Sequence, residues 1–388
     1  MSEADEEKEI LADLNLTSRG RGRREFLASS AGVLVAGAMA ALPFATRNAA
    51  AQSAGQASGN SKPHRIILDT DPGVDDAMAI LLALRSPELK IEAITPVAGN
   101  VPLELTLPNA LRLVELAGRT DIPVAGGASH PLVRNLITAK AVHGNNGLGG
   151  VELPTPKTRP VSETATEIIR RIVRASPGEI SIVAVGPLTN VGMALRADPE
   201  LAGMIRSIVV MGGSLSGGNV NPAAEFNFYV DPEAARIVFD AGVPLTMVGL
   251  DVTRKALLRE EHLKVLRETN TPVSQFAARI MKATMERWSG DGGKSVAMHD
   301  PLTVAHLIDP GILTLRDYYV GIETSGEMTA GQSLGYTRGP VRRSAPLETG
   351  GDPSSESAEP FRPNAKVAVE LDPDRFFRLL LGRLAGSA

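Results

Sequence analysis

The sequence predicts a single α/β domain built on an open, mainly parallel sheet that is flanked by helices. Short continuous runs of Val, Ile, Leu and Ala recur along the chain, which is typical of strands that are buried on both faces. Segments with a helical pattern separate these runs, and this alternation indicates βαβ units with parallel strand pairing. No internal repeat is visible in the sequence.

The predicted elements follow one another along the chain. Apolar, β-branched runs predict strands at residues 65–68, 91–97, 123–124, 180–185, 205–211 and 245–248. Helical spacing of apolar residues predicts helices at 77–84, 106–117, 164–175, 190–196 and 232–240, followed by a more polar helical stretch at 254–290. The Pro-, Gly- and Ser-rich segment 338–364 is expected to be a surface loop, whose role stays open, and residues 365–384 to be a closing strand and helix.

Composition excludes several classes of function. The chain has 388 residues and a formal net charge of −4, so it lacks the basic excess of a general nucleic-acid or membrane-surface binder. It contains no cysteine, which excludes disulfides, thiolate metal sites and a cysteine nucleophile. Because its charge is nearly balanced, we expect neither a nucleic-acid partner nor membrane association of the mature protein. The absence of cysteine is also compatible with an oxidising compartment.

The first 51 residues have the features of a signal peptide. Arg23 and Arg24 precede an uncharged apolar run at residues 28–44, and small residues at 49–51 fit a cleavage site. The run is short and only weakly apolar for a membrane span. The paired arginines resemble a twin-arginine signal, which predicts export to the periplasm. Residues 52–63 read as a linker, and residues 64–388 as the folded domain.

Four aspartates are clustered directly after the first predicted strand. Asp69 and Asp71 are two residues apart, so they share one face of the strand end. A Pro-Gly pair then turns the chain, and Asp75 and Asp76 begin the next helix. In open α/β sheets, ligands bind beyond the carboxyl ends of the strands. The cluster is therefore the strongest candidate for a functional site.

The charge of this cluster predicts a bound cation. Two carboxylates about 5 Å apart repel each other by roughly 3 kcal/mol at an effective dielectric constant near 20. Helix capping explains Asp75 or Asp76, because the helix dipole favours acids in the first turn, but it does not explain Asp69 and Asp71. Hard oxygen donors suit Ca²⁺ or Mg²⁺ rather than zinc.

Seven segments, taken in order, resemble one known family. Residues 69–77 (Asp-Thr-Asp-Pro-Gly-Val-Asp-Asp-Ala) are similar to the signature of the inosine-uridine preferring nucleoside hydrolases, which are calcium-dependent N-ribohydrolases with a Rossmann-resembling sheet. Six further segments similar to the family pattern are residues 95–100, 143–149, 183–190, 209–213, 218–227 and 298–301. The resemblance covers about residues 64–384 and identifies residues 64–388 as the catalytic domain.

The resemblance implies calcium-dependent hydrolysis of the N-glycosidic bond of ribonucleosides, which gives ribose and a free base. The Ca²⁺ ligands would be Asp71, Asp76, the backbone carbonyl of Val185, and Asp300. Asp71 would also be the catalytic base that activates the attacking water. Asp69 would support the site indirectly, or would simply be a buried acid paired with its neighbours.

The resemblance also assigns contacts with the nucleoside substrate. The predicted substrate-binding residues are Asp75, Asn100, His143, Met211, Asn219, Glu225 and Asn227. Among them, Asp75 would hold the ribose 2′-hydroxyl, and Asn219 and Glu225 the 5′-hydroxyl. His143 stands in a Gly- and Asn-rich segment that we expect to be a mobile, exposed loop.

His299 is predicted to be the acid that protonates the departing base, although other residues remain alternatives for this role. An ordinary histidine pKa near 6.5 would let it donate a proton at neutral pH. The purine-specific branch of the family tends to carry Trp at this position. The chain thus resembles the base-unspecific or pyrimidine-leaning branch more closely, and the preferred base stays open.

Two other functions remain open from the residues alone. An aspartyl-phosphate phosphohydrolase shares the strand-Asp-x-Asp pattern, but it has Thr or Val where Gly73 stands. An exported nucleoside-binding protein would keep the ribose contacts without needing a base at Asp71. Residues 331–336 and the long segment 338–364 depart from the family pattern. They leave the oligomeric state open, although we expect a homo-oligomer, either a dimer or a tetramer.

Overall fold

The computed structural model describes residues 62–287, 292, 294–338 and 361–386. The predicted signal peptide lies outside these ranges, as do most of the predicted linker and most of the 338–364 segment. All described residues belong to one compact unit. No helix among them is long and apolar enough to cross a membrane.

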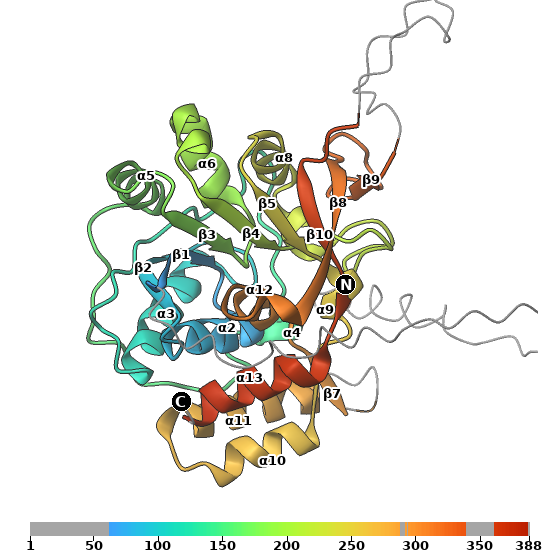
Figure 1. The fold of residues 1–388 in the computed structure, drawn as a ribbon. Helices are drawn as coiled ribbons and strands as arrows, with labels where there is room; N and C mark the ends of the chain where they lie inside the picture. The colour runs from blue at the N-terminus through green and yellow to red at the C-terminus, as the bar shows by residue number, and fades with distance from the viewer. Residues whose placement is uncertain (1–61, 288–291, 293, 339–360, 387–388) are drawn as a thin grey trace, which may run out of the picture. The chain divides into compact units, whose positions relative to one another are not determined.

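The main sheet has eight strands in the order β2-β1-β3-β4-β5-β10-β8-β9 (Figure 1). Their bounds are His64–Thr70 (β1), Leu89–Pro96 (β2), Ile180–Ala184 (β3), Ser207–Met211 (β4), Leu245–Val248 (β5), Leu313–Ile322 (β8), Ser333–Tyr336 (β9) and Ala365–Leu371 (β10). The pairings from β2 to β10 are parallel, whereas β8 is antiparallel to both β10 and β9. The prediction of a mainly parallel sheet is therefore confirmed.

Helices cover both faces of the sheet (Figure 1). One face carries Ala165–Ala175 (α5), Thr189–Ala197 (α6) and Pro232–Asp240 (α8). The other carries Val74–Leu84 (α2), Leu103–Leu116 (α3), Glu260–Glu268 (α10), Pro272–Arg287 (α11), His299–Ile308 (α12) and Pro373–Ala385 (α13). Side chains of β1 alternate between the two cores, since Ile66 and Leu68 join one apolar cluster and Ile67 joins the other.

Two helices on the first face begin where local side chains stabilise them. Thr164 Oγ1 accepts a hydrogen bond from the Glu167 N–H, and Glu167 Oε2 accepts one from the Thr164 N–H, which forms a capping box at α5. Asp231 accepts from the Ala234 N–H at the start of α8, where Pro232 is the first helical residue. Both helices therefore begin within one residue of the predicted positions.

Three parts of the fold differ from the sequence prediction. The stretch 254–290 is not helical throughout, because Leu257–Arg259 (β6) pairs antiparallel with Ser295–Ala297 (β7) before α10 begins. The predicted strand 123–124 is reduced to one bridge between Ile94 and Val124. Strands β8 and β9 were not predicted, and the many half-exposed residues of β8 explain why its apolar pattern is weak.

Candidate active site

The predicted site residues lie mainly where β1, β3 and β4 end and where α2 and α12 begin. The chain leaves β1 at Thr70, turns through Pro72 and Gly73, and enters α2 at Val74. Parallel pairing brings the end of β3 beside β1, with Ala184 opposite Asp69. The carboxyl ends of adjacent parallel strands thus meet at one edge, as in other open α/β sheets.

Asp76 holds the turn between β1 and α2 together. Its Oδ1 accepts from the Thr70 hydroxyl at 2.7 Å and from the Asp71 N–H at 3.1 Å. Its Oδ2 accepts from the Gly73 N–H at 3.0 Å and from Asn100 Nδ2 at 2.8 Å. Four donors converge on this one buried carboxylate, so the conformation of the turn depends on it.

Asp71 lies in a space that two glycines leave open. Its Oδ2 accepts from the Asn100 N–H at 2.7 Å, whereas its Oδ1 is buried and has no hydrogen-bond partner among the described residues. A Cβ at Gly99 would collide with Asp71 Oδ2, and a Cβ at Gly186 would lie 2.6 Å from Oδ1. A buried oxygen without a partner is costly, which suggests that a ligand contacts it.

Three further carboxylates converge beside Asp71. Asp75, Asp76 and Asp300 each offer an oxygen, and these oxygens lie within 4.8 Å of one another in buried positions. The cluster thus includes Asp75, which we expected to bind ribose, alongside the predicted ligands Asp76 and Asp300. Hard oxygen donors at this spacing, with the free Asp71 Oδ1 nearby, fit a divalent cation such as Ca²⁺.

Burial and mutual repulsion raise the pKa of these carboxyl groups. Burial, followed by the charge of Asp76, raises the pKa of Asp75 to about 8. The same two causes raise the pKa of Asp71 well above its usual range, and burial with the neighbouring aspartates does so for Asp300. A cation would offset this repulsion and favour the charged carboxylates.

Asn227 joins the ends of two strands. Its Nδ2 donates to the carbonyl of Val185, just after β3, at 2.9 Å, and to the carbonyl of Met211, at the end of β4, at 3.1 Å. A carbonyl oxygen has two lone pairs, so the Val185 carbonyl keeps one acceptor site for a further partner. The structure therefore brings Val185, Met211 and Asn227 together, and their contacts with a cation or with substrate stay predictions.

Glu225 and Asn219 hold the loop before Phe226–Val230 (α7). The buried Glu225 carboxylate accepts from the N–H groups of Gly213, Asn227 and Phe228, and burial raises its pKa to about 7. Asn219 is exposed, and its Oδ1 accepts from the Phe226 N–H at 2.9 Å. Both residues shape this loop, and their contact with substrate stays a prediction.

His143 is buried, so the expectation that its segment is an exposed loop is wrong at this residue. It ends the short helix Lys140–His143 (α4), and its Nδ1 accepts from the Val74 N–H at 3.0 Å. The ring lies 4.0 Å from Asp75 Oδ1, and burial lowers the pKa of His143 to about 4. The structure therefore places an uncharged imidazole beside the acidic cluster.

His299 begins α12, one residue before Asp300. Its Nδ1 lies 2.7 Å from the hydroxyl of Thr253, a contact that no local sequence signal indicates. Burial, with smaller effects of His143 and Arg254, lowers the pKa of His299 to about 4. The pKa thus lies below the ordinary value near 6.5 that we expected, because partial burial of the ring disfavours its charged form. At neutral pH the imidazole is uncharged and still carries one N–H.

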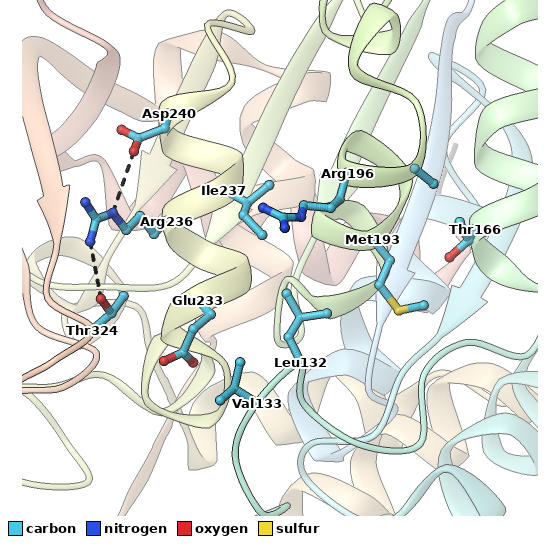
Figure 2. Close-up of a pocket in the computed structure, with 11 residues that line it drawn as sticks. Leu132, Val133, Thr166, Met193, Arg196, Glu233, Arg236, Ile237, Asp240 and Thr324 are labelled. Carbon is cyan, nitrogen blue, oxygen red and sulfur yellow. Dashed lines mark hydrogen bonds and ion pairs between the residues drawn. The ribbon is translucent and has the colours of Figure 1, made fainter.

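A separate hollow lies on the outer side of α6 and α8 (Figure 2). It has a volume of about 870 Å³. Exposed Leu132, Val133 and Met193 line it, together with charged residues that include Arg196 and Glu233. None of the predicted site residues lines this hollow, so it is distinct from the acidic cluster.

Comparison with known proteins agrees with this geometry. The family model described as inosine-uridine preferring nucleoside hydrolase matches residues 66–378. The pyrimidine-specific ribonucleoside hydrolase RihA of Citrobacter koseri is 45% identical over 322 residues, which are 82% of this chain and 97% of that protein. RihA of Salmonella gallinarum is 44% identical over 321 residues, with the same coverage.

Solved structures show the same fold. A plant nucleoside hydrolase, the PpNRh1 enzyme, matches with a TM-score of 0.74 and 35% identity, covering 83% of this chain and 99% of the other. A purine-preferring ribonucleoside hydrolase from Gardnerella vaginalis matches with a TM-score of 0.74 and 33% identity, covering 83% and 98%.

Proposed function

Because the chain belongs to the inosine-uridine preferring nucleoside hydrolase family and is a ribonucleoside hydrolase, we propose that it is an exported, calcium-dependent enzyme that prefers pyrimidine ribonucleosides. The observation that carries the calcium assignment is the convergence of buried Asp75, Asp76 and Asp300 beside the unpartnered Asp71 Oδ1. We assign residues 64–388 to the catalytic domain.

We propose that Asp71, Asp76, Asp300 and the Val185 carbonyl hold Ca²⁺. Oxygens of Asp76 and Asp300 lie close together with one of Asp75, so Asp75 can contribute as well. When bound, the ion would neutralise the carboxylates and orient the water and the ribose 2′- and 3′-hydroxyls. Hydrogen bonds already hold some of these ligand oxygens in place, such as those that Thr70 and Asn100 donate to Asp76.

Asp71 would act as the base in the hydrolytic step. Its Oδ1 would take a proton from the water as the water oxygen bonds to the anomeric carbon. The bond from that carbon to the base nitrogen breaks, through a transition state that resembles a ribosyl oxocarbenium ion. The bond from the Asn100 N–H to Oδ2 keeps the other carboxylate oxygen in place meanwhile.

His299 would supply the proton that the leaving base needs, and for this the substrate complex would have to raise its pKa from about 4, so that the ring is protonated before it donates. Its Nδ1 contact with the Thr253 hydroxyl orients the ring at the start of α12. We also propose that Asp75 binds the 2′-hydroxyl, that Asn100 and Asn227 bind further ribose hydroxyls, and that the remaining predicted contacts lie around them. These remaining residues are His143, Met211, Asn219 and Glu225.

The pyrimidine preference rests on the relatives named above, since both curated hydrolases are pyrimidine-specific and about 45% identical to this chain. The purine-preferring Gardnerella enzyme is less similar, at 33% identity. His299 also favours a pyrimidine preference, since the purine-specific branch of the family tends to carry Trp at this position. The expected result is a higher kcat/KM for uridine and cytidine than for inosine and adenosine.

The test is a comparison of kcat/KM across these four nucleosides, with release of ribose as the signal. p-Nitrophenyl phosphate serves as the control substrate, because release of phosphate from it would instead indicate a phosphohydrolase. Equal or greater efficiency on the purine nucleosides would contradict the pyrimidine preference. Binding of nucleosides without release of ribose would contradict the enzymatic function.

Export is proposed from the sequence of residues 1–51, which lie outside the described residues. Replacing both arginines of the pair with lysine should retain the protein in the cytoplasm, because twin-arginine signals are read through these two residues. Cell fractionation and immunoblotting measure the distribution. Unchanged accumulation in the periplasm would show that this signal is misassigned.

A further inference from the structure

Asp69 is a buried carboxylate that the proposed mechanism does not use. It is fully shielded from solvent near the end of strand β1, two residues before Asp71. Its Oδ2 accepts from the Thr95 hydroxyl at 2.6 Å and from Asn190 Nδ2 at 2.8 Å, whereas its Oδ1 has no partner among the described residues. A carboxylate in this position costs desolvation energy, so its contacts call for an explanation.

The contacts of Asp69 join three neighbouring segments at the edge where the strands end. Thr95 belongs to β2 and pairs with Asp69 in the strand register. Asn190 lies in the first turn of α6, and its Oδ1 accepts from the Ala128 N–H at 2.8 Å. The backbone carbonyl of Asp69 accepts from the Val185 N–H, just beyond β3, at 2.8 Å.

The loop from β3 to α6 is therefore attached to Asp69 at both ends. Val185 binds the backbone of Asp69 at one end of the loop, and Asn190 binds its side chain at the other. Between them, Gly186 lies so close to Asp71 that a Cβ there would be 2.6 Å from Oδ1. A shift of this loop would change the distance between the Val185 carbonyl and the Asp71 carboxylate.

We propose that Asp69 is a positioning residue that fixes the Val185 carbonyl and the Asp71 carboxylate at the separation that the bound cation requires. This inference rests on the proposed function, because it concerns two of the proposed ligands. Asp69 acts through its hydrogen bonds to Thr95 and Asn190. Side chains alternate along β1, so Asp69 faces the side of the sheet where α6 and Asn190 lie, while Thr70 faces α2.

Substitutions at Thr95 test the proposal without touching a proposed ligand. Thr95→Val keeps the shape of the side chain but removes the hydroxyl that binds Asp69, whereas Thr95→Ser keeps the hydroxyl. Calcium affinity is measured by isothermal titration calorimetry on chelator-stripped protein. We expect Thr95→Val to weaken calcium binding by about 10-fold, the lower range for residues that orient metal ligands, and Thr95→Ser to bind nearly as well as wild type.

A matched control and a double-mutant cycle separate positioning from general packing. Thr284→Val removes a buried hydroxyl on α11 that donates to the Ile280 carbonyl of the same helix, so it should leave calcium affinity unchanged. Adding Thr95→Val to Asp69→Ala should cause no further loss of calcium affinity if the hydroxyl acts through Asp69. If Asp69→Ala does not fold, the pair of Thr95 variants decides alone.

Three results would overturn the proposal: unchanged calcium affinity in Thr95→Val, an equal loss in Thr95→Ser, or independent losses in the cycle. The first of these, with calcium bound normally by the wild type, would remove the positioning role but leave the proposed function intact. A wild-type protein that binds no calcium would instead overturn the calcium assignment, and this inference with it.

Discussion

At the scale of single residues, Asp71 has room for its carboxylate because two residues beside it are glycines. Gly99 and Gly186 leave room for its carboxylate, and neither has a positive φ, so space rather than backbone conformation requires glycine there. Substrate and cation chemistry therefore depend on two residues that have no functional group of their own.

Gly99→Ala should lower activity strongly. The new Cβ would collide with Asp71 Oδ2 and lie 2.8 Å from Pro187 Cδ, so the carboxylate must move. A misplacement of about 1 Å costs on the order of 10²-fold in rate. Gly203→Ala is the matched control, because nothing lies within 4 Å of the Cβ it would add. Steady-state kinetics on uridine measure both variants, and equal rates would show that Asp71 tolerates the displacement.

Substitution of Asp71 should slow every substrate, whereas substitution of His299 should slow only some of them. Asp71→Asn should reduce the rate on every substrate by about 10²–10⁴-fold, as expected for the loss of a general base. His299→Ala should be slow on inosine, whose base must be protonated, and nearly normal on p-nitrophenyl riboside, whose leaving group departs as an anion. Measuring kcat for both variants on both substrates decides the roles. Equal losses of His299→Ala on the two substrates would remove this histidine from the proton-transfer step.

At the scale of elements, an ion pair between exposed Arg174 and buried Asp198 joins α5 to the end of α6. Arg174 on α5 donates to both carboxylate oxygens of Asp198 at 2.6 Å, and Arg170 lies 3.5 Å away. The hydrogen bond from Arg174 is the main cause that lowers the pKa of Asp198. A two-point bond of this kind fixes the two helices more firmly than a single contact.

The stability contributed by Asp198 should depend on pH. Because its folded pKa is lower than its unfolded value of 3.8, its contribution is present above that value and is lost as pH falls through the folded pKa. Asp198→Asn should therefore lower Tm at pH 7, and the difference from wild type should shrink below about pH 4. Differential scanning calorimetry between pH 3 and 7 measures this. Asp317→Asn, at an exposed pair with Lys366, is the control. A difference in Tm that does not change with pH would contradict the ion-pair explanation.

At the scale of the whole molecule, calcium should stabilise the fold as well as support catalysis. The clustered carboxylates repel one another without a cation, so a chelator should abolish activity and lower Tm. Binding to the native state alone adds about 2.7 kcal/mol at a ligand concentration of 100 Kd. Thermal melts and ribose release, with and without added Ca²⁺, measure both effects. Full activity in protein shown to be metal-free would exclude the calcium requirement.

We propose the hollow beside α6 and α8 as a contact surface of the expected homo-oligomer. Exposed Leu132, Val133 and Met193 form its apolar part, and acidic and basic residues lie together around it (Figure 2). In a two-fold contact the same patch meets itself, so its apolar side chains can pack together and its acids can pair with its bases.

Val133→Glu should therefore shift the mass of the protein in solution toward the monomer, as measured by light scattering after size-exclusion chromatography. Val265→Glu, an equal change at an exposed valine on α10, should leave the mass unchanged. An unchanged dimer or tetramer in Val133→Glu would place the interface elsewhere, and a monomeric wild type would remove the oligomer proposal.

Much of the fold could be predicted from the sequence, because strands buried on both faces produce continuous apolar runs. Strands β1 to β5 and helices α5, α6 and α8 lie within a few residues of their predicted positions. The antiparallel strands β8 and β9 were missed, since partly exposed strands produce a weaker apolar pattern. The order of strands also depends on pairings between distant segments, which local patterns do not contain.

By itself, the sequence determined the acidic cluster of residues 69–76, because those side chains are neighbours along the chain and their shared charge requires a partner. The family resemblance named Asp300 as a partner of this cluster, and the structure places it there. The tertiary structure alone shows that Asn190 and Thr95 hold Asp69 and that Thr253 contacts His299. It also decided the lower pKa values of the two histidines, because the fold buries His143 and partly buries His299. The physical reason is that hydrogen bonds and desolvation depend on distances in space, and the fold sets these between residues that are far apart in the chain.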